Sequence, residues 1–199
     1  MHYVFCILTG YLFGCVNFAT IFSKFKKVNL KENGTKNLGA TNAMLVMGKG
    51  VGFLVMLLDV LKTVIAIIIA RAVFPNFAAA GVLTGTSAVV GHIFPFYMKF
   101  KGGKGLACFG GMILALDPVL CIFMLVLCVG LMVIANHSVI VPYTAAVVFP
   151  LLYSANNPDT EIICISIIAG IILALRHIPD IKRVKDGGDT KIRDFFKHR

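Results

Sequence analysis

Apolar residues are gathered into seven runs along the chain, and short polar segments separate these runs. The runs are His2–Ser23, Val51–Phe74, Phe77–Met98, Leu106–Leu116, Pro118–Ala135, Val139–Tyr153 and Ile162–Leu175. A helix needs about 20 residues to cross a hydrocarbon core of about 30 Å, and several runs are shorter than this. Leu106–Leu116 is the shortest of them. We predict an all-α, polytopic membrane protein with about seven transmembrane helices.

The basic residues give an independent check, because Lys and Arg collect in the loops on the cytoplasmic side of a membrane. Of the 19 basic residues, 17 lie in three clusters: six from Lys24 to Lys49, three from Lys99 to Lys104, and eight from Arg176 to Arg199. Seven crossings place all three clusters on one side, with the N-terminus outside and the C-terminus cytoplasmic. Without a crossing at Leu106–Leu116 the last cluster would face the opposite side, so the charge pattern favours this short helix.

The overall composition is also that of a membrane protein. The chain is 58% hydrophobic and 14% charged, whereas about 25% of residues are charged in soluble domains. We interpret the net charge of +10 as a signal of orientation and of attraction to anionic membrane lipids, and expect no nucleic-acid partner. The six cysteines all lie in apolar runs without a C-x-x-C pair, so we expect neither a disulfide framework nor a metal site. Because the connections are short, residues 1–199 are expected to form a single membrane-embedded domain.

The polar segment Gly91–Gly105, which reads GHIFPFYMKFKGGKG, has the residues of an anion site at a membrane surface. Glycines let the backbone approach a ligand closely, while Lys99, Lys101 and Lys104 supply positive charge. The spacing is not that of a nucleotide-binding P-loop, because Met98 stands where such a loop needs a glycine. We expect this segment to bind a phosphate or a carboxylate.

Two further polar segments lie on the same predicted side of the membrane as Gly91–Gly105. Residues 33–42 read NGTKNLGATN and are rich in the hydroxyl and amide side chains that bind phosphate oxygens or cap helices. The other segment, RHIPDIKRVKDGGDTK, begins at Arg176, where the last apolar run ends. We predict that the three polar segments line one cytoplasmic cleft.

These three segments resemble the three motifs of the acyl-phosphate-dependent glycerol-3-phosphate acyltransferases of bacterial membranes. The resemblance runs through nearly the whole chain without gaps, and the middle motif is its most specific part. Asp59 and Lys62 match the helix that follows the first motif. The matching motif residues are Asn37, Gly39, Ala40, Thr41 and Asn42 in the first motif; Gly91, His92, Phe94, Pro95, Lys99, Phe100, Lys101, Gly102, Gly103, Lys104 and Gly105 in the middle one; and His177, Ile181, Lys182, Arg183 and Lys191 in the third.

The resemblance implies transfer of a fatty acyl group from acyl phosphate to glycerol 3-phosphate, giving lysophosphatidate and orthophosphate, as the first step of phospholipid synthesis. No cofactor or metal is implied, because acyl phosphate is already activated and only needs an aligned alcohol and stabilised charge. We expect Lys104 to bind phosphate and transition-state charge, and His177 to bind a phosphate or accept the alcohol proton. The backbone N–H groups of the glycines beside Lys104 are expected to assist it. The substrate-binding candidates are Thr35, Asn37, Thr41, Asn42, Lys49, Lys101, Gly102, Gly103, Gly105 and Asp180.

The first motif departs from the family pattern at three positions. Thr35 stands in place of Ser, Lys36 in place of Gly, and Leu45 in place of an Arg that is expected to bind phosphate. The change at Leu45 is the most serious, because it removes the charge and the fork of donors of the arginine, which a lysine elsewhere does not fully reproduce. We predict that Lys49, one turn further along the same helix, reaches the site instead.

Other departures lie near the N-terminus and in the third motif. Cys15, Asn17 and Ala19 replace Ser, Pro and Gly; Ile178, Pro179 and Asp180 replace Arg, Glu and Asn; and Asp189 replaces Glu. Asp180 introduces a negative charge where a neutral amide is expected to help hold a phosphate. These changes motivate the hypothesis of a diverged paralogue with another acyl acceptor or little activity.

A small-anion membrane transporter is an alternative from a different class. Asp59 and Lys62 form the one acid–base pair within the apolar runs, whereas a substrate pathway through the membrane usually needs more ionisable residues. We expect the two residues to pair inside the helix bundle.

For the acyltransferase we expect a monomer in the bacterial inner membrane. Its active site is predicted to face the cytoplasm, and membrane lipids are expected partners of its apolar helices.

Overall fold

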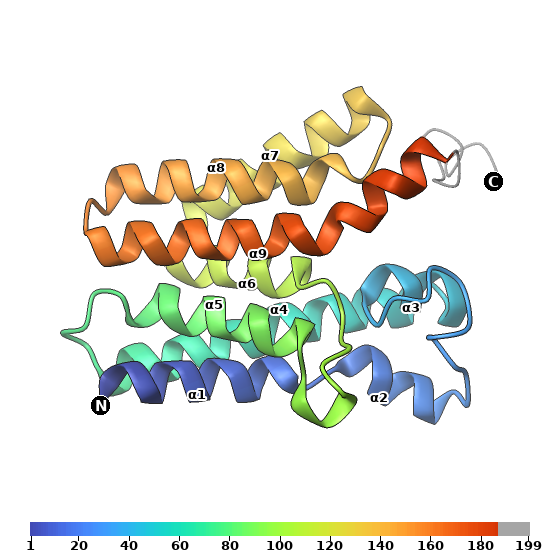
Figure 1. Cartoon of the computed structure of the whole chain (residues 1–199), viewed down its shortest axis with the longest axis horizontal. Coiled ribbons are helices and arrows are strands. Elements are labelled where there is room, and N and C mark those ends of the chain that lie inside the picture. Colours follow the sequence, from blue (N-terminus) through green and yellow to red (C-terminus); the bar gives the residue numbers. More distant parts are fainter. Residues whose placement is uncertain (187–199) are drawn as a thin grey trace. The chain divides into compact units, whose positions relative to one another are not determined.

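Helices account for every regular element of residues 1–186, the part of the chain that the computed structural model describes (Figure 1). This confirms the predicted all-α class. The elements are α1 (His2–Cys15), α2 (Phe18–Phe25), α3 (Ala40–Met47), α4 (Lys49–Val73), α5 (Ala80–Ile93), the 3₁₀ turn η1 (Phe96–Met98), α6 (Leu106–Leu116), α7 (Pro118–Ala135), α8 (Ile140–Asn156) and α9 (Thr160–Lys185).

Four helical stretches among the described residues are long and apolar enough to cross a membrane. They are His2–Phe25, Lys49–Val73, Pro118–Ala135 and Thr160–Lys185, and α6 and α8 are shorter apolar helices. The positions of α4, α6, α7 and α8 agree with the predicted runs within a few residues. Seven crossings and the orientation of the termini stay predictions.

Two of the predicted continuous helices are interrupted, which corrects their boundaries. The run His2–Ser23 breaks between α1 and α2, because Val16 is extended and the Asn17 side chain caps α2 by accepting a hydrogen bond from the N–H of Thr20 at 2.8 Å. The run Phe77–Met98 forms only α5 and η1. Pro95, which has no backbone N–H, stands between them with an extended backbone.

The chain divides into two compact units, Met1–Leu116 and Asp117–Arg199. In the first unit, α5 packs against α1, α4 and α6. Small residues allow the backbones of α1 and α5 to come close: a Cβ at Gly14 would overlap the Ala88 carbonyl, and one at Gly91 would overlap the Tyr11 carbonyl. Such small-residue contacts are typical of helix packing in membranes, where van der Waals contact drives association.

In the second unit, α8 packs against both α7 and α9. Aspartate side chains cap two of these helices, since Asp117 accepts from the N–H of Leu120 at 2.9 Å and Asp159 accepts from that of Glu161 at 2.8 Å. Pro179 lies inside α9, where it removes one helical hydrogen bond. Figure 1 shows α9 bending toward its C-terminal end, which we attribute to this proline.

Candidate active site

The segment between η1 and α6, residues 99–105, forms a loop that lies against the end of α5. We call it the Gly–Lys loop. The N–H of Gly102 donates to the Ile93 carbonyl at 3.0 Å, and the N–H of Gly103 donates to the His92 carbonyl at 3.1 Å. These carbonyls belong to the last turn of α5, whose final C=O groups have no partner within the helix. The two amides are therefore used inside the protein, which corrects the expectation that they donate to a bound anion.

Close packing explains why glycines occupy this loop. A Cβ at Gly103 would overlap the imidazole of His92 and would lie 2.8 Å from the Leu38 carbonyl oxygen. Gly105 has a φ of +88°, a conformation that side chains rarely adopt. The loop thus touches α5 on one side and the segment that contains Leu38 on the other.

Lys104 lies between two buried glycines, and its own side chain is half-buried. Helix α6 begins two residues later, at Leu106. The N-terminus of a helix carries partial positive charge from its unpaired N–H groups, so the lysine and the helix terminus both favour an anion at this place. Lys101 is exposed on the same loop.

A buried polar cluster lies beneath the Gly–Lys loop. The Lys62 ammonium is 2.7 Å from Oδ1 of Asp59 and 3.1 Å from Nδ1 of His92, and both Asp59 (1% exposed) and Lys62 (4%) are buried. The predicted pairing of Asp59 with Lys62 is confirmed. Lys62 also donates to the carbonyls of Gly14 at 3.1 Å and Val16 at 2.5 Å. The cluster therefore joins α4, α5 and the end of α1.

The donor atoms of Asp59, His92 and Cys108 lie within 4.8 Å of one another, and these residue types are common metal ligands. The Lys62 ammonium, however, contacts both Asp59 and His92. A cation thus already occupies the position between these two donors. We interpret the group as a structural cluster centred on an ammonium ion.

Two tyrosine hydroxyls form hydrogen bonds that connect α1 with η1 and with the residues just before η1. Tyr97 donates to the Cys15 carbonyl at 2.7 Å, and Tyr11 donates to the Phe94 carbonyl at 2.9 Å. The positioning roles of Tyr11, Tyr97 and the His92 ring were not predicted from the sequence. They could have been suspected, because polar groups within an apolar helix bundle must find hydrogen-bond partners.

The first polar segment is held by Asn42, which is buried in α3. Its Oδ1 accepts from the N–H of Thr35 at 2.7 Å, and its Nδ2 donates to the carbonyls of Leu30 at 3.0 Å and Asn33 at 3.1 Å. Both amide hydrogens are therefore used to hold the loop that carries Thr35. A second amide, Asn17 Nδ2, donates to the Leu38 carbonyl at 3.0 Å and connects this segment to the start of α2.

The other candidates of the first segment are placed at the surface of the unit. Thr41 is exposed in the first turn of α3, Asn37 is half-buried, and Leu45 is exposed. Lys49 is not on the same helix as Leu45, which corrects the prediction. Gly48, with a φ of +99°, ends α3, and Lys49 is the first residue of α4.

The third segment belongs to the second unit. His177 is buried in α9, and its Nδ1 lies 2.9 Å from the Leu173 carbonyl. Asp180 is half-buried and lies 3.7 Å from the Arg183 guanidinium, so its negative charge has a local counter-ion. Asp189 and Lys191 lie outside the described residues.

Within the first unit, then, the structure brings together two of the three polar segments. The Gly–Lys loop touches Leu38, and Leu38 lies in the segment that carries Thr35, Asn37 and Asn42. The assignments of individual residues to catalysis or substrate binding stay predictions. The contact does agree with the expectation that the first and middle motifs are neighbours.

Comparisons of the sequence with a family model and with known proteins all find glycerol-3-phosphate acyltransferases. The family model described as "Glycerol-3-phosphate acyltransferase" matches residues 4–187. A glycerol-3-phosphate acyltransferase of Thermoanaerobacter sp. (strain X514) is 33% identical over 193 residues, which cover 96% of this chain and 96% of the relative. The protein of that name from Aquifex aeolicus (strain VF5) is 32% identical over 192 residues, covering 96% of this chain and 100% of the relative.

Two solved structures are similar to the chain over nearly its whole length. Both are crystal structures of PlsY (YgiH), an integral membrane glycerol 3-phosphate acyltransferase. The glycerol 3-phosphate form has a TM-score of 0.88 and 29% identity, and covers 96% of each chain. The lysophosphatidic acid form has a TM-score of 0.87 and 28% identity, and covers 98% of this chain and 97% of that one.

Proposed function

The chain belongs to the glycerol-3-phosphate acyltransferase family, and on that premise we propose that it transfers a fatty acyl group from acyl phosphate to glycerol 3-phosphate. The observation that carries this proposal is the family match over residues 4–187, which includes the whole Gly–Lys loop. The products are lysophosphatidate and orthophosphate. The similar PlsY structures, in glycerol 3-phosphate and lysophosphatidic acid forms, support this choice of acceptor and product.

The reaction exchanges one carbon–oxygen bond for another. A hydroxyl oxygen of glycerol 3-phosphate attacks the acyl carbon, and the bond from that carbon to the phosphate oxygen breaks. The hydroxyl proton leaves with a base or with the departing orthophosphate. Negative charge develops on the acyl oxygen and on the leaving phosphate, so the protein has to align the two substrates and stabilise this charge.

Lys104 is our candidate for that stabilisation. Its half-buried position places its charge in a medium of lower dielectric than water, where electrostatic interactions are stronger. The following N-terminus of α6 adds partial positive charge at the same place. We propose that Lys104 binds the phosphate of the acyl phosphate and strengthens this contact in the transition state.

His177 is our candidate for accepting the hydroxyl proton or binding a phosphate. A backbone carbonyl only accepts hydrogen bonds, so the contact of 2.9 Å between His177 Nδ1 and the Leu173 carbonyl needs a proton on Nδ1. In a neutral imidazole this leaves Nε2 as the basic nitrogen. The bond to Leu173 thus selects the tautomer that general-base chemistry needs.

The remaining substrate-binding candidates divide into two groups. Direct contacts to phosphate or glycerol oxygens are proposed for Thr35, Asn37, Thr41, Lys49 and Lys101. Asp180 is proposed to contact a glycerol hydroxyl. Asn42, Gly102, Gly103 and Gly105 act through the shape of the backbone that they hold. We further propose that 1–199 acts as a single monomeric enzyme of the cell membrane, with its site facing the cytoplasm.

A different small phosphorylated or polar acceptor is a second candidate, favoured by two observations. Leu45 offers no charge where the family has an arginine, and Asp180 brings a carboxylate into the third motif. Both changes weaken the binding of a phosphate dianion. An acceptor with fewer charges would be less affected.

The test is an assay of purified full-length protein with palmitoyl phosphate, measured as orthophosphate release and as lipid product. We expect lysophosphatidate to form only when glycerol 3-phosphate is present, and a panel of other small alcohols and phosphates to give no product. Product with another acceptor alone would favour the second candidate. Absence of any product from folded protein would contradict acyl transfer from acyl phosphate.

A further inference from the structure

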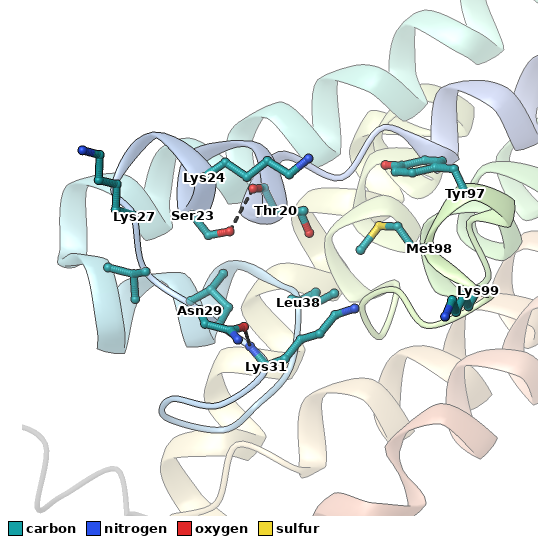
Figure 2. Close-up of a pocket in the computed structure, with 12 residues that line it drawn as sticks. Thr20, Ser23, Lys24, Lys27, Asn29, Lys31, Leu38, Tyr97, Met98 and Lys99 are labelled. Carbon is teal, nitrogen blue, oxygen red and sulfur yellow. Dashed lines mark hydrogen bonds between the residues drawn. The ribbon is translucent and has the colours of Figure 1, made fainter.

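A lysine-lined cleft lies in the first unit, and Lys104 is not among the residues that line it. Its volume is about 700 Å³, and it is bounded by α2, by residues 27–31, by Leu38 and by residues 97–99 (Figure 2). Four lysines line it: Lys24, Lys27, Lys31 and Lys99. Four like charges around one cavity repel one another, so an anion that neutralises them would be bound favourably.

The lysines approach the cleft from both sides. Lys24 and Lys27 stand at the end of α2 and just after it, whereas Lys99 follows η1. In Figure 2 the side chain of Lys31 extends toward the segment that carries Lys99, and the end of Lys27 points outward. A group held between Lys31 and Lys99 would therefore meet positive charge from two separate segments.

Two of these lysines adopt a backbone conformation that is unfavourable for them. Lys27 has a φ of +53° and Lys99 a φ of +55°, both in the left-handed region that glycine and asparagine occupy more easily. Holding a residue with a side chain there is unfavourable, and such positions cluster at ligand sites. The strain thus falls on two cationic residues of one cleft.

The walls of the cleft are partly apolar, and exposed aromatic residues stand next to its lining residues in the sequence. Leu30 and Leu38 are buried beneath it. Beside the lysines, Phe25 is 80% exposed, Phe96 56% and Phe100 60%. Aromatic residues next to lysines are typical of the headgroup level of a membrane, where apolar rings enter the lipid and charges stay at its surface.

We propose that this cleft binds the phosphate headgroup of an anionic membrane phospholipid. Lys24, Lys31 and Lys99 contact the phosphate, while Lys27, whose end points outward, adds positive charge nearby. The exposed phenylalanines lie against the upper part of the acyl chains. Apolar walls and exposed rings favour a lipid over a soluble phosphate, which would leave the rings in water. None of the residues that line this cleft is among the proposed catalytic or substrate-binding residues, although Lys99 belongs to the Gly–Lys loop and Leu38 lies against Gly103.

The experiment measures lipid binding by full-length protein in detergent, using native mass spectrometry with added phosphatidylglycerol or phosphatidylcholine. We expect phosphatidylglycerol to bind more tightly than phosphatidylcholine. Replacing Lys24 and Lys31 together by Gln should weaken phosphatidylglycerol binding by about tenfold, since each lysine near an anionic group contributes. A thermal unfolding curve of each variant shows that it is folded.

Matched variants locate the site. The double replacement Lys26→Gln and Lys36→Gln removes the same charge from two exposed lysines that do not line the cleft, and should leave binding unchanged. Lys104→Ala should also keep it. Equal loss in either control, unchanged binding in the cleft variant, or equal binding of both lipids would overturn the proposal. Displacement of the lipid by orthophosphate or glycerol 3-phosphate would do so too, because it would indicate a site for soluble phosphate. Acyl transfer is not measured, so this outcome is independent of the proposed function.

Discussion

The Lys62 ammonium and the Asp59 carboxylate lie 2.7 Å apart on one face of α4. Lys62 also holds two carbonyls at the end of α1, and it contacts His92, against which Gly103 packs. The ion pair is therefore part of the support of the loop that carries Lys104. A change in the pair is expected to affect both stability and activity.

Replacing Lys62 by Met should destabilise the protein by about 3–5 kcal/mol, because Asp59 is left as a buried charge without its ammonium partner. The double variant Asp59→Asn, Lys62→Met should lose less than the sum of the two single changes. Unfolding in detergent measures both. Lys182→Met, at an exposed lysine of α9, serves as the control and should have little effect. Single variants as stable as the wild type would show that the pair contributes nothing.

Gly103→Ala should abolish most activity, because the added methyl group overlaps the His92 ring and displaces the loop beside Lys104. Gly110→Ala is the matched control, since a Cβ there meets nothing within 4 Å. The measurement is the rate of lysophosphatidate formation by each folded variant. Equal rates would mean that the close approach of Gly103 to His92 is not needed.

Lys36→Gly should stabilise the protein by about 1 kcal/mol. Lys36 has a φ of +59°, which glycine adopts without a steric penalty, and the family pattern has glycine there. Lys26→Gly is the comparison, because Lys26 has a φ of −81° and gains nothing from glycine. If unfolding experiments give Lys36→Gly no advantage over Lys26→Gly, the backbone at this position is not strained.

Leu45→Arg should raise kcat/KM for glycerol 3-phosphate by about tenfold, because a guanidinium offers charge-assisted hydrogen bonds to phosphate. Leu45→Gln keeps a polar side chain without the charge and should give little change. Steady-state rates at varied glycerol 3-phosphate concentrations provide the comparison. An unchanged or lower kcat/KM in Leu45→Arg would indicate that this chain binds its acceptor without position 45.

The helices were predictable from the sequence where one apolar run makes one helix, as in Leu106–Leu116 and Pro118–Ala135. The Asp59–Lys62 pair was predictable as well, because a spacing of three residues places both on one helical face. The break at Val16 and Asn17 was not, since it depends on contacts to Leu38 and Lys62 from distant segments. Hydrophobicity alone does not record such contacts.

The candidate site was predictable at the level of segments but less so for single groups. Gly48 takes a φ of +99° and starts a new helix at Lys49, which the sequence pattern of residues 40–50 does not reveal. The amides of Gly102 and Gly103 were expected to face an anion, but the end of α5 provides carbonyls that need donors. In both places the local backbone conformation determines where these groups lie, and the order of residues alone does not indicate it.

The role of Lys104 in acyl transfer is tested most directly by comparing Lys104→Ala with Lys26→Ala in the formation of labelled lysophosphatidate from palmitoyl phosphate and labelled glycerol 3-phosphate. We expect Lys26→Ala to behave like the wild type and Lys104→Ala to lose about 10²–10³-fold in kcat, the effect typical of removing one charge-stabilising donor. Wild-type protein that makes no lysophosphatidate, or a Lys104→Ala variant that makes it at the wild-type rate, would contradict this role.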